Sequence, residues 1–240
     1  MVNNKTVFVS GASSDIGLVL CRMYGEAKYH VIAHYRTERD ELNALGDEFS
    51  NVELFHFDFM DTVAFENELQ TNRSFFERAD IFVNLAASLS DIAYQDVDAE
   101  ALLSAMRVNV VPGMLLMQVM GPAMSARGWG RIVQASSIGV KFGGGRNSFA
   151  YSLSKHTLEF IPSICRTWSE AGVLTNVVRI GVTDTRIHSH LPDKNLRERA
   201  AMIPMKRAAN PEEIAKTLFW LGSDQNDYVT GQVIAASGGE

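Results

Sequence analysis

Two side chains four residues apart have the residue types of an acid–base pair. Tyr151 and Lys155 lie in a segment at 151–170 that is expected to be helical, and side chains four residues apart leave the same face of a helix. An ammonium group beside a phenol stabilises the phenolate and lowers the phenol pKa from its usual value of about 10. The pair therefore predicts general acid–base chemistry, in which Tyr151 exchanges a proton with a substrate.

Two hydroxyls and an amide add to this candidate site. Ser136 and Ser137 follow an expected strand, and a glycine-rich stretch at 143–145 separates them from Tyr151. A serine hydroxyl and the phenol are therefore expected at the same edge of a sheet. Asn109 lies within an otherwise apolar helical stretch. A buried amide needs hydrogen-bond partners, and we expect them on the helix that carries Tyr151.

Small residues after the first expected strand are typical of a phosphate-binding turn. Residues 10–17 read Ser-Gly-Ala-Ser-Ser-Asp-Ile-Gly. Small side chains let the backbone approach a pyrophosphate closely, and free N–H groups at the start of the next helix can hold its oxygens. The candidate cofactor-binding residues of this turn are Gly11, Ser13, Ser14, Asp15, Ile16 and Gly17.

The ends of the next strands carry further candidates. The second expected strand ends at Arg36, and no acid follows before Glu38. An acid at this place hydrogen-bonds a ribose 2′-hydroxyl, whereas an arginine accommodates a 2′-phosphate, so NADP(H) is favoured over NAD(H). Asp58 and Phe59 follow the third strand, where they are expected to hydrogen-bond and flank an adenine. After the fourth strand, the residues expected to pass close to the cofactor are Asn84 and Ala86.

Strand-like and helix-like segments alternate along the whole chain and would position these residues. Expected strands lie at 6–10, 29–35, 52–57, 81–86, 131–135, 175–180 and 233–236. Expected helices lie at 16–24, 38–48, 65–78, 99–126, 151–170 and 211–221. Short strands that are apolar throughout belong in a parallel sheet covered on both faces. The sequence therefore predicts one Rossmann-like, doubly wound α/β domain over 1–240, with ligands beyond the carboxyl ends of its strands.

Composition excludes several other classes of protein. The 240 residues carry a net charge of -6, which argues against a general nucleic-acid binder. Cys21 and Cys165 do not form a redox motif, so a reducing compartment is expected. The first residues do not resemble a signal peptide, and no run of about 20 apolar residues predicts a membrane span. A cytoplasmic protein without a membrane partner is expected.

These elements, in this order, resemble the short-chain dehydrogenase/reductase family, in its common single-domain branch, over nearly the whole chain. Besides the residues above, the matching elements include residues 176–185, 203–215 and 228–239. The resemblance implies that Tyr151 protonates a carbonyl oxygen during reduction, or acts as the base in the reverse direction. Lys155 would lower the Tyr151 pKa and hydrogen-bond the nicotinamide ribose. Ser137 would position the substrate oxygen, and Asn109 would hold a water that relays protons.

The resemblance also implies a nicotinamide site, a lid and an assembly. The segment that would orient the nicotinamide carboxamide comprises Gly181, Val182, Thr183 and Thr185. A mobile substrate lid would extend through Arg199, and family members commonly assemble as dimers or tetramers. His188 and His190 lie in this lid, but no third ligand with suitable spacing predicts a metal site. A small carbonyl or alcohol substrate is expected, with 3-oxoacyl-carrier-protein reductases the nearest comparison.

Several positions depart from the family pattern and leave alternatives open. Asp15 stands where the family has a second glycine; we expect its carboxylate to turn toward the helix N–H groups that it can cap. Ile180 replaces a proline and Ser237 an aspartate, and Ala87 replaces a glycine. The spacing from Ser137 to Tyr151 is one residue longer than usual, so Ser136 is an alternative catalytic serine. A sugar or sugar-nucleotide oxidoreductase, and a non-catalytic NADP(H)-binding regulator, remain the alternative functions.

Overall fold

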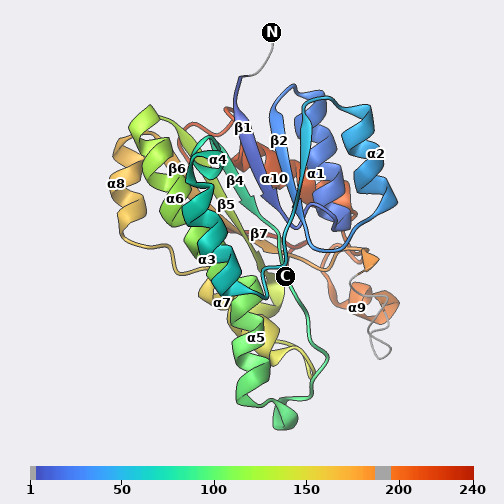
Figure 1. The fold of residues 1–240 in the computed structure, drawn as a ribbon. Coiled ribbons are helices and arrows are strands. Elements are labelled where there is room, and N and C mark those ends of the chain that lie inside the picture. The colour runs from blue at the N-terminus through green and yellow to red at the C-terminus, as the bar shows by residue number, and fades with distance from the viewer. Residues whose placement is uncertain (1–3, 187–195) are drawn as a thin grey trace.

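Seven short strands form one parallel sheet, with the order β3-β2-β1-β4-β5-β6-β7 (Figure 1). This computed structural model describes residues 4–186 and 196–240. The strands are β1 (Thr6–Ser10), β2 (His30–Tyr35), β3 (Val52–His56), β4 (Ile81–Asn84), β5 (Gly130–Ser137), β6 (Val173–Ile180) and β7 (Val233–Ala236). Every neighbouring pair is parallel, and the strand order reverses between β1 and β4. The predicted doubly wound sheet is confirmed.

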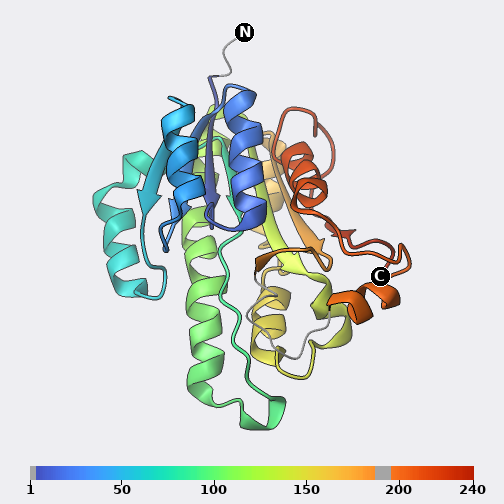
Figure 2. The same cartoon turned by 90° about the vertical axis from the view of Figure 1, so that its right-hand side faces the viewer.

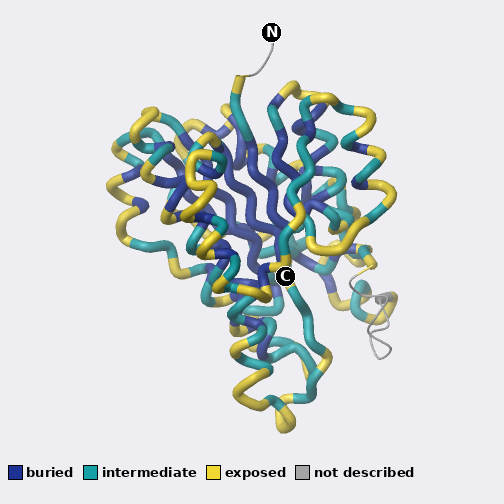
Figure 3. The backbone as a smooth tube through the Cα atoms, in the orientation of Figure 1, coloured by how far each residue is buried: buried dark blue, intermediate teal, exposed yellow. Residues whose placement is uncertain are grey.

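Helices cover both faces of this sheet and bury its central strands (Figures 1 and 3). One face packs against α1 (Asp15–Glu26), α2 (Asp40–Glu48) and α10 (Pro211–Leu221). The other packs against α3 (Thr62–Thr71), α4 (Arg73–Glu77), α6 (Val111–Arg127) and α8 (Ile164–Glu170). Because the central strands are buried on both faces, they are apolar throughout instead of alternating with polar residues.

Two helices extend beyond the carboxyl edge of the sheet, where the candidate site residues gather. They are α5 (Ala99–Asn109) and α7 (Phe149–Thr157), which pack against each other (Figures 1 and 2). Short 3-10 turns precede them, η1 (Tyr94–Asp96) and η2 (Ile138–Phe142). A further helix, α9 (Leu196–Met202), was not predicted.

Three segments predicted as single helices are each divided, which corrects their expected bounds. The segment 65–78 separates into α3 and α4 at Asn72, and 99–126 separates into α5 and α6 at Val110. The segment 151–170 separates into α7 and α8. Pro112 and Pro162 explain the last two breaks, because proline has no N–H to donate to the carbonyl four residues earlier.

The stretch Ala99–Arg127 is long and apolar enough to span a membrane by composition alone. However, half of its most apolar window is buried inside the protein, and the helix axis is interrupted at Val110. Leu116, Met120 and Met124 are fully buried against the sheet. We therefore assign the second part of this stretch, α6, to the core of the fold, whereas α5 extends beyond the sheet.

Candidate active site

Ser137 and Tyr151 form a hydrogen-bonded pair at the carboxyl edge of the sheet. Ser137 is the last residue of β5, and its hydroxyl accepts from the Gly139 N–H at 3.2 Å and hydrogen-bonds the Tyr151 phenol. Ser136 points elsewhere: its hydroxyl donates to the Lys155 carbonyl and Glu159, at 3.1 and 2.8 Å. Successive residues of a strand face opposite sides of a sheet, so of these two serines it is Ser137 that lies beside the phenol.

The glycine-rich loop brings the phenol to this serine despite the longer spacing. Gly143 and Gly144 adopt φ angles of 72° and 90°, which few other residues tolerate. A Cβ on Gly144 would lie 2.9 Å from the Ser152 Oγ, so the loop also packs tightly against α7. The extra residue is therefore accommodated between η2 and α7, and Ser137 keeps its place.

Lys155 is buried one helical turn after Tyr151. Its ammonium group donates to the Ala135 carbonyl at 2.7 Å and lies 5.9 Å from the centre of the Tyr151 ring. Burial lowers the Lys155 pKa to about 8. Burial likewise raises the Tyr151 pKa to about 12, and the hydrogen bond with Ser137 only partly opposes this. The expected lowering of the phenol pKa is therefore wrong for this structure, because the loss of hydration on burial is the largest cause of the shift.

Asn109 connects the turn after β4 to the helix that carries Tyr151. It is 1% exposed, and its carboxamide oxygen accepts from the Ser88 N–H at 2.6 Å. Its NH₂ group donates to the Ser88 carbonyl and to the Ser154 hydroxyl, at 3.1 and 2.8 Å. Ser154 in turn donates to the Tyr151 carbonyl at 2.7 Å. The predicted hydrogen-bond partner of Asn109 is thus found on α7, the helix that carries Tyr151. Asn109 holds α7 in position relative to the turn after β4.

The turn after β1 forms a backbone cradle in which glycine is required. Gly11 has a φ of 71°, and a Cβ there would lie 2.8 Å from the Ala86 nitrogen. A Cβ on Gly17 would lie 2.5 Å from the Gly11 oxygen. Ser14 caps α1 by accepting from the Gly17 N–H and donates to the Gly11 carbonyl. These contacts leave no room for side chains at Gly11 and Gly17, as is typical of a turn through which a backbone approaches a pyrophosphate.

His34 supports the cradle from beneath and was missed by the sequence analysis. Its Nδ1 accepts from the Gly11 N–H at 3.2 Å, so its Nε2 carries the proton given to the Phe57 carbonyl. Burial lowers the His34 pKa to about 3, which keeps the ring neutral. The Phe59 ring stacks on His34 at 3.9 Å and is 3% exposed. The side chain predicted to flank an adenine therefore faces the core.

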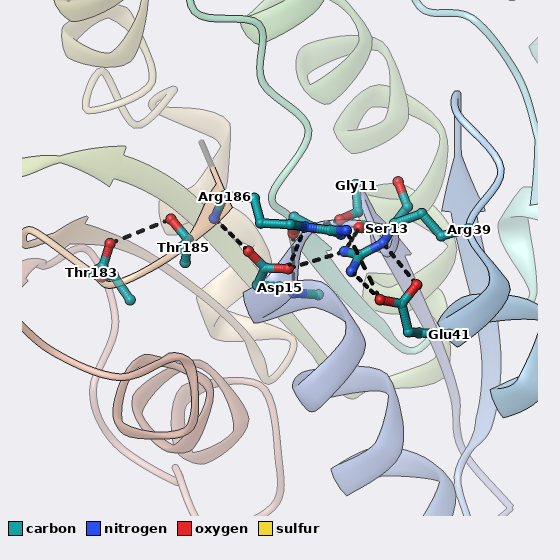
Figure 4. Close-up of polar contacts among 10 residues, drawn as sticks. Gly11, Ser13, Asp15, Arg39, Glu41, Thr183, Thr185 and Arg186 are labelled. Atoms are coloured by element: carbon teal, nitrogen blue, oxygen red, sulfur yellow. Dashed lines mark hydrogen bonds and ion pairs between the residues drawn. The ribbon is translucent and has the colours of Figure 1, made fainter. Parts of the chain in front are cut away.

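Asp15 joins two arginines across the mouth of the cradle (Figure 4). Its carboxylate accepts from the Arg186 backbone N–H at 2.8 Å, and lies 3.1 Å from the Arg186 Nε and the Arg39 Nη1. Arg39 also donates to the Ser13 carbonyl, and its other edge pairs with Glu41. The expectation that Asp15 turns toward the α1 cap is wrong, because Ser14 already fills that role. Partial burial raises the Asp15 pKa, which Arg39 opposes.

The other strand ends are arranged around this cradle. Arg36 is exposed, and its carbonyl hydrogen-bonds His56 at 3.0 Å. Asp58 accepts from the Met60 N–H at 2.9 Å. Asn84 is internal: it accepts from the Ser10 hydroxyl and donates to Gln134, at 2.6 and 2.7 Å. The Asn84 side chain therefore ties β1, β4 and β5 together, while Ala86 supplies backbone beside Gly11.

The segment after β6 continues the same edge. The Gly181 N–H donates to the Ala236 carbonyl at 2.9 Å, and a Cβ on Gly181 would lie 2.5 Å from the Ser237 Cα. Thr183 is buried and its hydroxyl donates to the Gly181 carbonyl, while Thr185 donates to the Thr183 carbonyl. Val182 is partly exposed between them. Of the predicted lid, which extends through Arg199, residues 187–195, including His188 and His190, lie outside the described residues.

The sequence contained one indication of the two arginines, the carboxylate of Asp15, but only the fold shows which cations lie near it. A carboxylate at a glycine position beside an anion site implies that a cation lies near it. Arg39 and Arg186 are far from Asp15 along the chain, and sequence spacing cannot pair them. The structure brings them together because the turn after β1, the loop after β2 and the segment after β6 meet at one edge.

Known proteins resemble this chain along its whole length. A family model described as enoyl-(acyl carrier protein) reductase matches residues 11–240. Acetoacetyl-CoA reductase of Rhizobium meliloti (strain 1021) is 28% identical over 240 residues, covering 99% of this chain and 98% of that protein. The 3-oxoacyl-(acyl-carrier-protein) reductase FabG of Thermotoga maritima is 26% identical over 247 residues, covering 99% of this chain and 98% of the relative.

A solved structure has the same fold as this chain. A candidate NAD(P) dependent gluconate 5-dehydrogenase from Beutenbergia cavernae, with NADP bound at low occupancy, is 31% identical with a TM-score of 0.86. The alignment covers 98% of this chain and 95% of that one. These relatives are named as enzymes that act on carbonyl or hydroxyl groups, which speaks against the regulatory alternative. The chain belongs to the short-chain dehydrogenase/reductase family.

Proposed function

We propose that the protein is an NADP(H)-dependent oxidoreductase that uses Ser137, Tyr151 and Lys155 to interconvert a carbonyl group and an alcohol. The observation that carries this proposal is the hydrogen bond between the Ser137 hydroxyl and the Tyr151 phenol, with a buried ammonium one helical turn away. Two O–H groups at one place can both donate to a single oxygen, which is what a carbonyl needs as it becomes an alkoxide.

The residues of the cradle fit a dinucleotide. Gly11 and Gly17 keep side chains out of the space between the first turn and α1, as the close Cβ contacts require. The Asp58 carboxylate would hydrogen-bond the adenine, and the arginine-bearing segment that follows β2 favours a 2′-phosphate over a 2′-hydroxyl. Gly181, Val182, Thr183 and Thr185 would orient the nicotinamide carboxamide. Within the described residues one of the three Lys155 N–H donors meets Ala135, and ribose hydroxyls suit the others.

The pKa values of the pair suit reduction. A dihydronicotinamide, when bound, supplies the hydride to the carbonyl carbon. Because the Tyr151 pKa is about 12, the phenol carries its proton at neutral pH and can give it to the substrate oxygen. Ser137 donates a hydrogen bond to the same oxygen. Lys155 stabilises the phenolate that remains, and Asn109 holds α7 so that both groups face one point.

The substrate is proposed from the relatives. Two of them are named reductases of acetoacetyl-CoA and of a 3-oxoacyl carrier protein, so a 3-oxoacyl thioester is the first candidate. The gluconate 5-dehydrogenase name favours a keto-sugar acid as the second. We further propose a cytoplasmic homo-oligomer, a dimer or a tetramer, as is common in this family.

The test is NADPH consumption with acetoacetyl-CoA and with 5-ketogluconate. Tyr151→Phe should lower turnover by at least about a hundredfold, because it removes the proton donor. Ser137→Ala should also impair turnover, whereas Tyr228→Phe, which alters a phenol that is 90% exposed, should not. Full activity of Tyr151→Phe would refute the assignment, and NADPH consumption with 5-ketogluconate but not with acetoacetyl-CoA would replace the thioester by the keto-sugar acid as the substrate.

A further inference from the structure

We propose that Arg39, positioned by Asp15, recognises the adenosine 2′-phosphate, so that Asp15 and Arg39 together set the preference for NADP(H). The inference rests on the proposed function only in requiring that a nicotinamide dinucleotide binds. It assigns the discrimination to a residue three positions beyond the arginine at the end of β2, and gives a role to the carboxylate that replaces a cradle glycine.

The Arg39 side chain lies between the two parts of the site that an adenosine ribose must bridge. In this fold the pyrophosphate lies at the start of α1 and the ribose at the end of β2. Arg39 follows β2, and its guanidinium donates to the Ser13 carbonyl in the turn before α1 (Figure 4). The side chain is 13% exposed. Its guanidinium is therefore held beside the position of the ribose 2′ substituent.

One edge of this guanidinium already binds an anion. The Arg39 Nε and Nη2 donate to the two carboxylate oxygens of Glu41, at 3.3 and 2.9 Å. This fork of two N–H groups also matches phosphate oxygens. The Glu41 side chain is 59% exposed, whereas that of Arg39 is 13% exposed, so Glu41 can move into water when a ligand phosphate takes over its bonds to Arg39. Glu41 therefore holds the place that a 2′-phosphate would take.

Asp15 fixes the opposite edge of the same group. It accepts from the Arg39 Nη1 while its other oxygen accepts from the Arg186 backbone N–H. An arginine whose conformation is set before the ligand arrives loses less entropy on binding. The Arg36 side chain is not preorganised in this way, because it is exposed at the end of β2. The electrostatic repulsion between Asp15 and the pyrophosphate is thus offset, because Asp15 also holds Arg39 in the conformation that binds the 2′-phosphate.

The two carboxylates that contact Arg39 allow positioning to be separated from simple charge. Removing either negative charge would favour the more anionic NADPH if charge alone mattered. Under the proposal they act in opposite directions. Glu41→Gln removes a competitor and should raise NADPH preference, whereas Asp15→Asn releases Arg39 and should lower it.

The experiment is calorimetric titration of the full chain with NADPH and with NADH, reporting the ratio of the two dissociation constants. Arg39→Gln should reduce the NADPH preference by at least about tenfold, the value of a charge-assisted hydrogen-bond pair. Arg22→Gln is the matched control, since Arg22 on α1 forms a similar two-bond pair with Glu48 at the end of α2. An unchanged ratio in Arg39→Gln, or a raised ratio in Asp15→Asn, would overturn the proposal.

A double variant tests whether Asp15 acts through Arg39. Asp15→Asn combined with Arg39→Gln should show the ratio of Arg39→Gln alone, and a further fall would overturn the positioning role. Arg39→Lys, which keeps the charge but loses the fork, should retain only part of the preference. Unmodified protein that binds both cofactors equally refutes this inference and leaves the oxidoreductase proposal to the Tyr151→Phe assay; protein that binds neither refutes both.

Discussion

At the scale of single residues, burial determines the chemistry of the site more than proximity does. Tyr151 and Lys155 are neighbours on one helix face, as their spacing predicts. Yet burial moves both pKa values toward the neutral forms, to about 12 and about 8. The charged form of Lys155 therefore lowers the free energy of unfolding, although its ammonium group donates to the Ala135 carbonyl.

This cost predicts that Lys155→Met stabilises the protein while abolishing turnover. The folded-state pKa of about 8 lies below the ordinary 10.5. Between these values the unfolded state binds more protons, so the unfolding free energy of the unmodified protein rises with pH across this window. Lys155→Met should be more stable at pH 7 by up to about 3 kcal/mol, and the difference should shrink toward pH 10.

Thermal or urea unfolding of both proteins at several pH values measures this difference. Since every other titrating group is shared, subtracting the two curves isolates Lys155. A constant difference between pH 7 and pH 10 would contradict a lysine whose pKa is lowered by burial.

Residue types and spacing could identify the residues that react but not those that prepare the site. Tyr151, Lys155 and Ser137 were found because acid–base chemistry restricts their types and because strand ends converge at one edge. The pairing of Asp15 with Arg39 was not found, since it depends on how two loops meet. The role of the neutral His34 beneath the cradle was not predicted for a similar reason. A histidine inside a strand does not indicate which backbone N–H group donates to its ring.

At the scale of secondary-structure elements, interrupted helices place the catalytic groups. α7 ends at Thr157, and just beyond it the Glu159 carboxylate, 7% exposed, binds the Arg179 guanidinium on β6 at 2.7 and 2.6 Å. Ser136 on β5 donates to the same carboxylate. Burial would raise the Glu159 pKa, but these donors hold it below its usual value. The pair thus fixes the end of α7 against the sheet, where the helix stops.

The space around two helical glycines predicts opposite effects of alanine substitution on stability. Gly121 on α6 faces Trp168 on α8, and a Cβ there would lie 2.3 Å from the indole ring. Gly121→Ala should therefore destabilise the protein by about 1–3 kcal/mol through overpacking. Gly46 on α2 meets Leu54 at an ordinary 3.5 Å, so Gly46→Ala should stabilise by up to about 1 kcal/mol.

Denaturant unfolding of the two variants measures both effects. The same substitution is made within a helix in each case, which leaves the local space as the difference. Equal effects of the two changes would contradict the close approach of α6 and α8.

The strands could be predicted closely because buried parallel strands are short apolar runs bounded by polar turns. The helices could be located but not divided. Apolar periodicity continues through Val110, and the break there follows from Pro112 together with the Asn109 side-chain bonds, which lie outside the pattern of a single helix. α9 was missed because the surrounding charges resemble a loop.

At the scale of the whole molecule, several exposed apolar side chains lie on the part beyond the sheet. Leu103 on α5, Leu153 on α7 and Phe160 just after α7 are 52%, 40% and 76% exposed. α5 and α7 pack together, so these side chains belong to one region of the molecule. Large apolar groups in water favour burial against another protein surface, and this supports the proposed homo-oligomer.

Phe160→Glu should therefore weaken assembly, because a carboxylate would be buried at the subunit contact. Val63→Glu is the control: Val63 is 69% exposed, near the start of α3. Mass measurement by light scattering over a dilution series should show a smaller particle for Phe160→Glu only. A monomeric unmodified protein, or equal behaviour of the two variants, would contradict the prediction.

The strand order has a consequence for the time course of folding. Val7 on β1 pairs with the nearby Val31 on one side and with the much more distant Ile81 on the other. The first pairing closes a short loop, whereas the second must wait for a much longer one. Gly11 packs on the Ala86 backbone and Ser10 bonds Asn84, so the cradle is complete only after the second event. During refolding, helical structure should therefore appear before the chain gains the ability to bind a dinucleotide.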